Sequence, residues 1–315
     1  MNWLFQLAFL GVLIALTLKI LSDLDVSKVV YSHQPGPCRK IQGVVDGSED
    51  ITLLSSGYAI VSSGVAVWEY PKKSPMLYVI DNSKQVIDVL QLDVEKVEAV
   101  YKRTIKSSTF RLLNNLVMVG PDQFYATNFL FYTSTTMLVL ELGLQLPFGS
   151  VIYYDGSKGH EVLRGLKGPN GIALSSDKKT LFLALNVAEE LRSYRIGDNA
   201  THLTLEDTVH LYSGADNLFL ETNADGSTNS IWVGSHPVTY LLAGHLQNAS
   251  KFHAPSQVLK VGIDKSSNRF STVKEVYADD GRILRGASAV VRYGDLLLIG
   301  TIQHDLMLCQ LKHAP

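Results

Sequence analysis

The chain has 315 residues, of which 46% are hydrophobic and 18% are charged, and its formal net charge is −2. This length allows one large domain or two small ones, and the apolar content is enough for a sizeable core. The near-neutral charge, without a block of like charges, excludes the basic footprint of a nucleic-acid-binding protein.

The first predicted element is an apolar segment from Trp3 to Leu18, interrupted only by Gln6. It is shorter than the roughly 20 residues of a membrane-spanning helix and resembles the apolar region of a secretory signal. No basic region precedes it, and no clear cleavage site follows. We interpret residues 1–22 as a signal peptide or a retained signal anchor and residues 23–315 as the globular body. A buried core helix is the alternative.

The two cysteines, Cys38 and Cys309, lie near the two ends of the body. An even number of cysteines after a secretory segment suggests a disulfide, and two free buried thiols are the alternative. Asn199-Ala-Thr and Asn248-Ala-Ser are glycosylation acceptor sequences. Together these features favour a lumenal or extracellular location, either secreted or membrane-anchored.

The body repeats one short pattern. An apolar strand, usually preceded by an oxygen-bearing side chain, is followed by a polar turn and a second strand, which predicts an antiparallel pair. Repeats of this kind every few tens of residues predict an all-β propeller, whose ring would be closed near Cys38 and Cys309. A sandwich built of unrelated hairpins is the alternative. The repeats occupy residues 49–63, 115–128, 169–186, 216–236 and 287–302.

The ends of the repeated strands carry oxygen ligands that a propeller would bring to its axis. Carboxylate and amide oxygens without a histidine or cysteine cluster favour a hard cation such as calcium over zinc. Turns and solvated side chains at these positions are the alternative. The candidate calcium ligands are Glu49, Asn128, Asn170, Asp216 and Asn217.

Several motifs resemble those of the serum paraoxonase/arylesterase family, and they occur in the family's order over nearly the whole body. They are GSED at 47–50, RTIK at 103–106, VGPDQFYATN at 119–128, NGI at 170–172, DN at 216–217, WVGSHP at 232–237, and LLIGTI at 297–302 followed by LCQL.

The resemblance implies a calcium-bound six-bladed propeller that is secreted or anchored through a retained signal. It implies hydrolysis of aryl esters, lactones and, in some members, organophosphates, so that small esters and a membrane or lipid surface are the expected partners. It also implies that the five candidate ligands hold the catalytic calcium and that Cys38 and Cys309 form the family's disulfide.

The mechanism implied by the resemblance is attack of water on a carbonyl polarised by calcium. Glu49 is a candidate catalytic residue because it could bind the ion and orient the water. His236 would stand near the pocket wall, where a lone histidine serves equally well as a packing residue.

The chain also departs from the family pattern. Between GSED and RTIK it is about one blade shorter, and the family's His-Gly-Ile stretch, which carries one histidine of a proposed dyad, is missing. The second histidine should fall where Asp81 and Asn82 stand. The family's second, structural calcium expects an acidic residue at Phe129, which leaves only Asp50 as a remnant. We therefore expect an incomplete propeller, one blade short, and a weak or absent second calcium.

Three functions follow from these observations. The first is a calcium-dependent hydrolase of aryl esters and lactones. The second is a catalytically weak or inactive paraoxonase-like membrane protein that assists folding or assembly of membrane partners. The third is a secreted binding propeller without metal, which would leave the five oxygen ligands unexplained.

Overall fold

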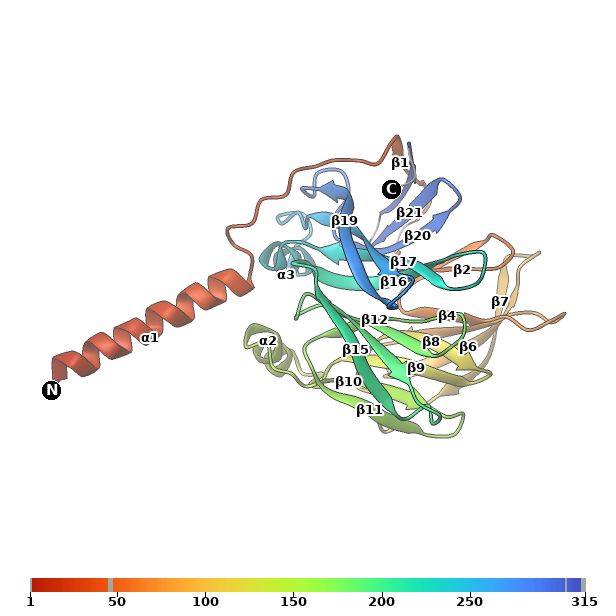
Figure 1. Cartoon of the computed structure of the whole chain (residues 1–315), viewed down its shortest axis with the longest axis horizontal. Helices are drawn as coiled ribbons and strands as arrows, with labels where there is room; N and C mark the ends of the chain where they lie inside the picture. The colour runs from red at the N-terminus through yellow and green to blue at the C-terminus, as the bar shows by residue number, and fades with distance from the viewer. Residues whose placement is uncertain (1, 45–47, 304, 313–315) are drawn as a thin grey trace.

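The computed structural model describes residues 2–44, 48–303 and 305–312. These residues form five antiparallel four-stranded sheets and one two-stranded sheet, arranged around a common axis (Figure 1). The predicted all-β propeller is therefore confirmed. Residue 1 and residues 313–315, at the two ends of the predicted domains, lie outside the described residues, as do residues 45–47.

Four blades each consist of consecutive strands. The first contains β4 (Val65–Trp68), β5 (Met76–Asp81), β6 (Val86–Asp93) and β7 (Glu98–Ile105). The second contains β8 (Leu112–Gly120), β9 (Gln123–Leu130), β10 (Gly149–Tyr154) and β11 (Gly159–Leu166). The third contains β12 (Pro169–Leu174), β13 (Thr180–Leu185), β14 (Glu190–Ile196) and β15 (Leu203–His210). The fourth contains β16 (Gly214–Thr222), β17 (Thr228–His236), β18 (Ser256–Asp264) and β19 (Arg269–Asp279).

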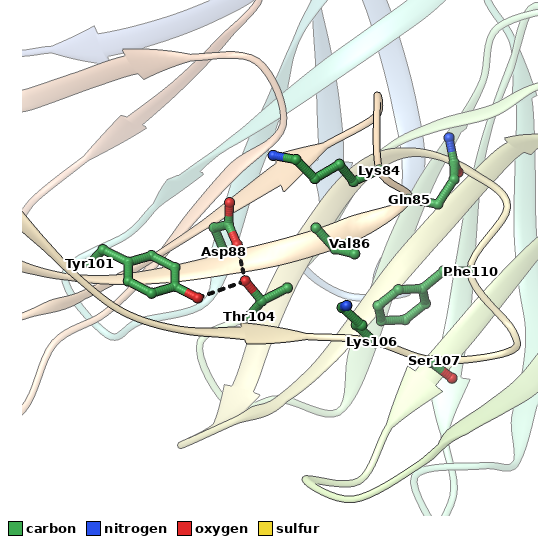
Figure 2. A pocket seen from close by; sticks show the side chains of 9 residues that line it. All are labelled: Lys84, Gln85, Val86, Asp88, Tyr101, Thr104, Lys106, Ser107 and Phe110. Carbon is green, nitrogen blue, oxygen red and sulfur yellow. Dashed lines mark hydrogen bonds between the residues drawn. The ribbon is translucent and has the colours of Figure 1, made fainter.

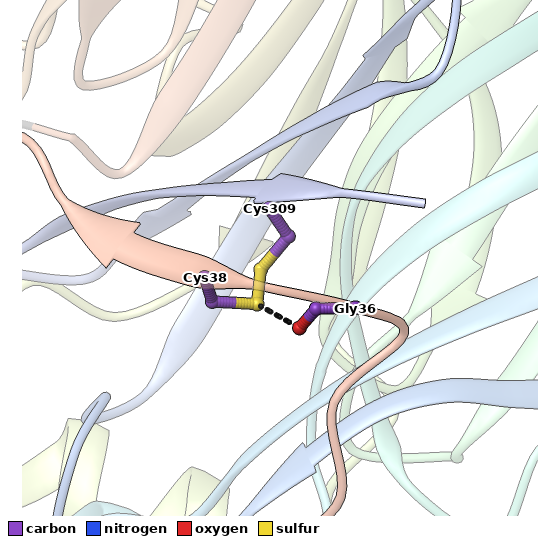
Figure 3. Close-up of a disulfide and its surroundings, with 3 residues drawn as sticks. All are labelled: Gly36, Cys38 and Cys309. Carbon is purple, nitrogen blue, oxygen red and sulfur yellow. Dashed lines mark hydrogen bonds between the residues drawn. A yellow bond between two sulfur atoms is a disulfide. The ribbon is translucent and has the colours of Figure 1, made fainter. Parts of the chain in front are cut away.

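The fifth blade combines the two ends of the body. Its strands are β20 (Ala287–Tyr293), β21 (Leu296–Thr301), β22 (Leu306–Gln310) and, at the outer edge, β1 (Cys38–Lys40). Cys38 lies directly opposite Cys309 in this pairing, and the two form a disulfide (Figure 3). Lys40 and Asp305 add an ion pair across the same junction. The predicted ring closure and its disulfide are confirmed, and free thiols are excluded.

The two-stranded sheet consists of β2 (Asp50–Leu53) and β3 (Ala59–Ser62). β2 contacts β20 on one side and β4 on the other, so the hairpin stands between the fifth and first blades. The described chain therefore has five complete blades, and the hairpin stands where a complete six-bladed ring would have one more. This arrangement agrees with the expected propeller that is one blade short.

The sequence repeats correspond to the hairpin and to four of the five blades. The blade made of β4–β7 was missed. Its first strand follows Gly64 rather than an oxygen-bearing side chain, and residues 69–75 separate β4 from β5. The pattern that identified the other blades is therefore absent from this one.

The core lies between neighbouring blades, where apolar side chains from facing sheets pack together. One cluster joins the first two blades and includes Tyr78, Ile87 and the stacked rings of Phe124 and Tyr154. Another joins the fourth and fifth blades around Trp232. Burial of these large side chains is the main stabilising contribution to the ring.

An N-terminal helix, α1 (Asn2–Asp23), projects from the propeller (Figure 1). Its segment Phe5–Asp23 has a mean hydropathy of 2.0 and none of it is buried against the rest of the described chain. The alternative of a buried core helix is therefore wrong. By length and composition α1 is able to cross a membrane, and a signal sequence has the same properties.

Two short helices follow the second strand of their blades. α2 (Thr135–Gly143) comes after β9, and α3 (Thr239–Gln247) comes after β17. β9 and β17 run antiparallel to the innermost strands of their blades, β8 and β16. Both helices therefore lie at the end of the propeller where β8 and β16 begin. In Figure 1 they lie on the side from which α1 projects.

Removing the disulfide by replacing both Cys38 and Cys309 with alanine should lower the free energy of unfolding by about 2–5 kcal/mol, because the bridge restricts the unfolded chain. Urea unfolding in oxidising conditions measures the change. A reducing agent should weaken the natural chain and leave the double variant unaffected. Equal stability of the two chains would contradict a closing role for the bridge.

Candidate functional site

The innermost strands bring polar residues to the axis through interruptions of their pairing. β8, β12, β16 and β20 each carry a register shift near their first residues. A bulge of this kind turns a side chain out of the regular alternation of a strand. The shifts span residues 113–116, 169–172, 215–218 and 287–289, and they contain Asn115, Asn170, Asp216, Asn217 and Ser288.

Asp216 is the one carboxylate among these five residues. Its Oδ2 lies 2.7 Å from Nε2 of His236, which faces it from the end of β17, and both side chains are almost completely buried. Its Oδ1 has no hydrogen-bond partner, and neither has the buried Oδ1 of Asn170. Gly171 leaves no room for a side chain, because a Cβ there would lie 2.3 Å from the Asp216 carbonyl oxygen. The starts of β12 and β16 therefore pack directly together.

Asn217 connects the fourth blade to the hairpin and to the second blade. Its Nδ2 donates to the carbonyl oxygen of Glu49 at 2.8 Å and lies 3.4 Å from Glu49 Oε1. Its Oδ1 accepts a hydrogen bond from Nδ2 of Asn115. Ser288 donates to the same Glu49 carbonyl from β20. The fourth and fifth blades thus hold the Glu49 carbonyl oxygen in place, and Asn115 of the second blade holds Asn217.

Asp50 fastens the hairpin to the neighbouring blades. Its Oδ2 accepts from the backbone N–H of Val65 at 2.8 Å and from Asn115 Nδ2 at 3.4 Å. Its Oδ1 accepts from the N–H of Ile51. Glu49 Oε2 accepts from the N–H of Gly64 at 3.1 Å. The carboxylates of both residues therefore take the donors at the start of the first blade.

Burial raises the pKa of all three carboxyl groups. For Glu49, burial is reinforced by the charges of Asp216 and Asp50. Burial raises the pKa of Asp50 to about 6, against the backbone hydrogen bonds from Val65 and Ile51. Burial also raises the pKa of Asp216, and the hydrogen bond from His236 offsets it only in part. Charged carboxylates at this position need compensation by a proton or a cation.

The side-chain amide of Asn128 forms its hydrogen bonds within the second blade and with the segment that precedes β8. Its Oδ1 accepts from the N–H of Arg111 at 2.9 Å. Its Nδ2 donates to the carbonyl oxygen of Thr109 and to Oγ of Ser150. The structure therefore brings together four of the predicted ligands, Glu49, Asn170, Asp216 and Asn217, and directs the Asn128 amide to the segment before β8.

The structure also describes the residues at which the resemblance implied a second histidine and a second calcium. Asp81 and Ser83 form a turn outside the axial group, in which the Asp81 carboxylate accepts from the Ser83 N–H and pairs with Lys84. Phe129, which follows Asn128 in β9, stands where the resemblance implied an acidic residue. Asp50 is the predicted remnant of the second calcium site. Its carboxylate oxygens accept hydrogen bonds from Val65, Ile51 and Asn115.

The residues at the axis suit a hard cation, although no group of three or more His, Cys, Asp and Glu side chains with metal-binding geometry occurs in residues 2–44, 48–303 and 305–312. A cation here would need amide oxygens as well as carboxylates. The buried, unpartnered Oδ1 atoms of Asp216 and Asn170 are oxygen ligands of the kind that calcium accepts. The negative charge of Glu49 and Asp216 matches a divalent ion.

A cavity of about 580 Å³ lies beside β7, the last strand of the first blade (Figure 2). It lies between the β5–β6 turn, β6, β7 and the segment before β8. Tyr101, Thr104 and Asp88 form a chain of hydrogen bonds along one side of it. None of the predicted site residues lines this cavity, so it is separate from the candidate site.

Both predicted glycosylation acceptors are exposed. Asn199 lies in the loop before β15, where its Oδ1 accepts from the N–H of Thr201. Asn248 follows α3, where its Oδ1 accepts from Ser250 and Lys251. Both amides are therefore accessible, and glycosylation stays a prediction.

A ring of blades with bulged inner strands and a cluster of carboxylates and amides at one end of the axis defines a β-propeller with a polar axial site. The chain belongs to the arylesterase family, which it matches over residues 71–311.

Curated relatives cover most of the chain. Mechanosensory abnormality protein 6 of Caenorhabditis elegans is 27% identical in an alignment that is 354 residues long with its gaps. The alignment covers 94% of this chain and 92% of the relative. Serum paraoxonase/lactonase 3 of Oryctolagus cuniculus is 29% identical and covers 88% of this chain and 90% of the relative. The first alignment is longer than the chain itself, so the relative contains residues without a counterpart here.

Among solved structures, a luciferin-regenerating enzyme is similar with a TM-score of 0.52 and 12% identity, covering 88% of this chain and 96% of that one. At this identity the likeness shows the fold alone.

Asn115 is the site residue that the sequence interpretation did not select. It joins Asp50 to Asn217 and is buried. The repeat pattern contained the signal, because Asn115 stands directly before an apolar strand, as Asn217 does. Ser288, which holds the Glu49 carbonyl, was missed for a different reason: a serine is a weak candidate for a ligand.

Replacing Asn115 with leucine should lower the free energy of unfolding by about 1–3 kcal/mol, because Asp50 and Asn217 lose a buried donor. The adjacent Asn114→Leu is the matched control, since the Asn114 Oδ1 has no partner. Chemical unfolding of both variants measures the difference. Equal losses would show that Asn115 does not link the axial residues.

The stability of the metal-free chain should depend on pH through Asp50. Its pKa is raised to about 6 in the folded chain, so the folded chain binds more protons than the unfolded chain between about pH 4 and pH 6. The free energy of unfolding should therefore fall as the pH rises through this window. In Asp50→Asn the decrease in the free energy of unfolding over this window should be smaller, by on the order of 2 kcal/mol. Unfolding in a chelator at several pH values measures it, and identical slopes would refute the assignment.

Proposed function

We propose that this protein is a calcium-dependent hydrolase of aryl esters and lactones. The observation that carries the proposal is the buried pair of unpartnered oxygens, Asp216 Oδ1 and Asn170 Oδ1, beside two further ligands in a member of the arylesterase family. The names of two relatives, a paraoxonase/lactonase and a paraoxonase/arylesterase, support ester and lactone substrates.

Glu49, Asn170, Asp216 and Asn217 would hold the calcium. When bound, the ion supplies Lewis-acid polarisation of the substrate carbonyl and stabilises the developing oxyanion. Asn128 could join them through the second lone pair of its Oδ1, because the hydrogen bond from the Arg111 N–H uses only one.

The chain's own groups would orient the reactants. His236 Nε2 holds Oδ2 of Asp216, which leaves Oδ1 directed away from that contact. Glu49 Oε1 has only a long contact with Asn217 Nδ2, so it can accept a proton from an attacking water. Glu49 would thus act as the candidate base, and His236 would position Asp216.

We also propose that the propeller lies outside the cytosol. The disulfide between Cys38 and Cys309 and the exposed acceptors Asn199 and Asn248 support an oxidising compartment of the secretory pathway. The exposed apolar surface of α1 supports attachment to a membrane or lipid surface, and a cleaved signal would leave a secreted propeller.

A second candidate is a protein without catalysis that assists folding or assembly of membrane partners. The reduced blade at β2–β3 and the turn at Asp81, which lacks a histidine, favour it. The similarity to mechanosensory abnormality protein 6 covers nearly the whole chain and is equally compatible with this function.

The deciding experiment is hydrolysis of phenyl acetate and a simple lactone by the full chain in detergent, with calcium and then with a chelator. Asp216→Ala should lower kcat/KM by at least about 100-fold, because it removes the central carboxylate. Asp225→Ala, an exposed turn residue of the same blade, is the matched control.

Thermal unfolding with and without calcium separates the two candidates. Hydrolysis that requires calcium and Asp216 supports the enzyme. No hydrolysis by a chain that calcium still stabilises would favour the non-catalytic function. No effect of calcium on either measurement would rule out the metal site.

A further inference from the structure

The ten residues that follow α1 are fastened to the propeller at both ends. Residues 24–33, here called the strap, contact α3, the β13–β14 turn, the segment before β16, and β19. A simple linker between an anchor and a domain would need none of these contacts.

Asp25 ends α1. The N–H of Asp25 bonds to the carbonyl oxygen of Ser22, and the N–H of Val26 bonds to that of Leu21. These are the two hydrogen bonds of a Schellman motif, and Asp25 occupies its left-handed position with a φ of 58°. The chain therefore reverses direction at a residue with a fixed backbone conformation.

The same residue begins α3. The residue before α3, Val238, has no side chain that can cap the helix. Instead Oδ2 of Asp25 accepts from the N–H of Thr239 at 3.0 Å and from its hydroxyl at 2.9 Å. The carbonyl oxygen of Leu24 accepts from the N–H of Tyr240 at 3.1 Å. The strap thus supplies partners for two of the free N–H groups at the start of α3.

Lys28 extends the attachment to two neighbouring loops. Its Nζ pairs with Asp25 Oδ1 at 2.9 Å and with Glu189 at 3.7 Å. It also donates to the carbonyl oxygen of Tyr212 at 2.7 Å. The Asp25 side chain is only 10% exposed, so this ion pair is weakly screened by solvent.

The far end of the strap pairs with the fourth blade. His33 forms an antiparallel bridge with Ala278 of β19, with hydrogen bonds in both directions. Its Nε2 lies 2.8 Å from Glu275. Both ends of the strap are therefore fixed to the blade that carries Asp216.

The strap contacts lie beside the axial site in the chain. Thr239 is three residues after His236, and Tyr212 is four residues before Asp216. The two segments held by Asp25 and Lys28 are thus the ones that carry the buried His236–Asp216 pair.

We propose that the strap positions α3 and the ends of β16 and β17 at the axial site, with Asp25 as its main positioning residue. The effect on substrate rests on the proposed hydrolase function, whereas the effect on α3 does not. The anchor helix and the site-bearing end of the propeller are then one rigid assembly, and the state of the strap determines how well the site is ordered.

Asp25 offers a pair of variants that separate its roles. Asp25→Gly still favours the left-handed backbone conformation but removes the side chain that caps α3. Asp25→Asn keeps a capping oxygen and tolerates the left-handed conformation, and it loses only the charge that pairs with Lys28. Lys28→Met removes the ion pairs with Asp25 and Glu189 together with the hydrogen bond to the Tyr212 carbonyl oxygen, and it leaves the cap in place. Asp23→Ala, which loses only its exposed pair with Lys19, is the matched control.

Hydrogen exchange of the full chain in detergent measures the strap without reference to activity. Asp25→Gly should increase exchange at the amides of Thr239 and Tyr240 about fivefold, the usual size of a lost cap, while α2 stays unchanged. Asp25→Asn should keep most of the natural chain's protection from exchange at these two amides. Unchanged exchange in both Asp25→Gly and Lys28→Met would overturn the proposal.

Kinetics with phenyl acetate then test the positioning role. Asp25→Gly should raise KM several-fold with a smaller change in kcat, and Asp25→Asn should recover most of the loss. Faster exchange with unchanged KM and kcat would reduce the strap to a tether and overturn the positioning role. A natural chain without hydrolysis would refute the proposed function, while exchange would still decide whether the strap holds α3.

Discussion

Three carboxyl groups, those of the buried Asp50 and Asp216 and of the partly buried Glu49, lie near one another where the sheets converge. Like charges in such a place are unfavourable unless protons, hydrogen-bond donors or a cation offset them. The donors come from different sheets: Asn115 from β8, the Val65 backbone from β4, and His236 from β17. Neutralising this group therefore requires the blades to meet in one arrangement, and the bulges at the starts of the inner strands provide the necessary directions.

The same constraint explains how a ring with a reduced blade stays closed. The β2–β3 hairpin has only two strands and little core of its own. Asp50 and Glu49 attach its start to the first blade, while Ser288 and Asn217 hold the Glu49 carbonyl from the fifth and fourth blades. Polar contacts at the axis thus replace part of the packing that outer strands would supply. The disulfide between β1 and β22 secures the adjoining blade.

The N-terminal helix leaves the propeller near the segments that carry the axial site. α1 leaves the propeller on the side of α2 and α3, and the strap ties its end to the segments that carry His236 and Asp216 (Figure 1). A hydrolase attached to a membrane through α1 would receive its substrate near the membrane surface. The non-catalytic alternative would use the same end of the propeller to face a membrane partner, so both functions depend on the same geometry.

The sequence by itself determined the propeller, the closure at Cys38 and Cys309, and the axial group of Glu49, Asn170, Asp216 and Asn217. The propeller and the axial group rest on local signals: a turn, an alternating strand, or an oxygen-bearing residue directly before an apolar run. The closure rests on two cysteines placed near the two ends of the body. Only the tertiary structure decided that the Asn128 amide serves its own blade, that Asn115 joins the axial group, and that Asp25 caps a helix 214 residues away. Such contacts join residues that are distant in the chain, and a hydrogen bond between distant residues leaves no periodic pattern in the sequence around either partner.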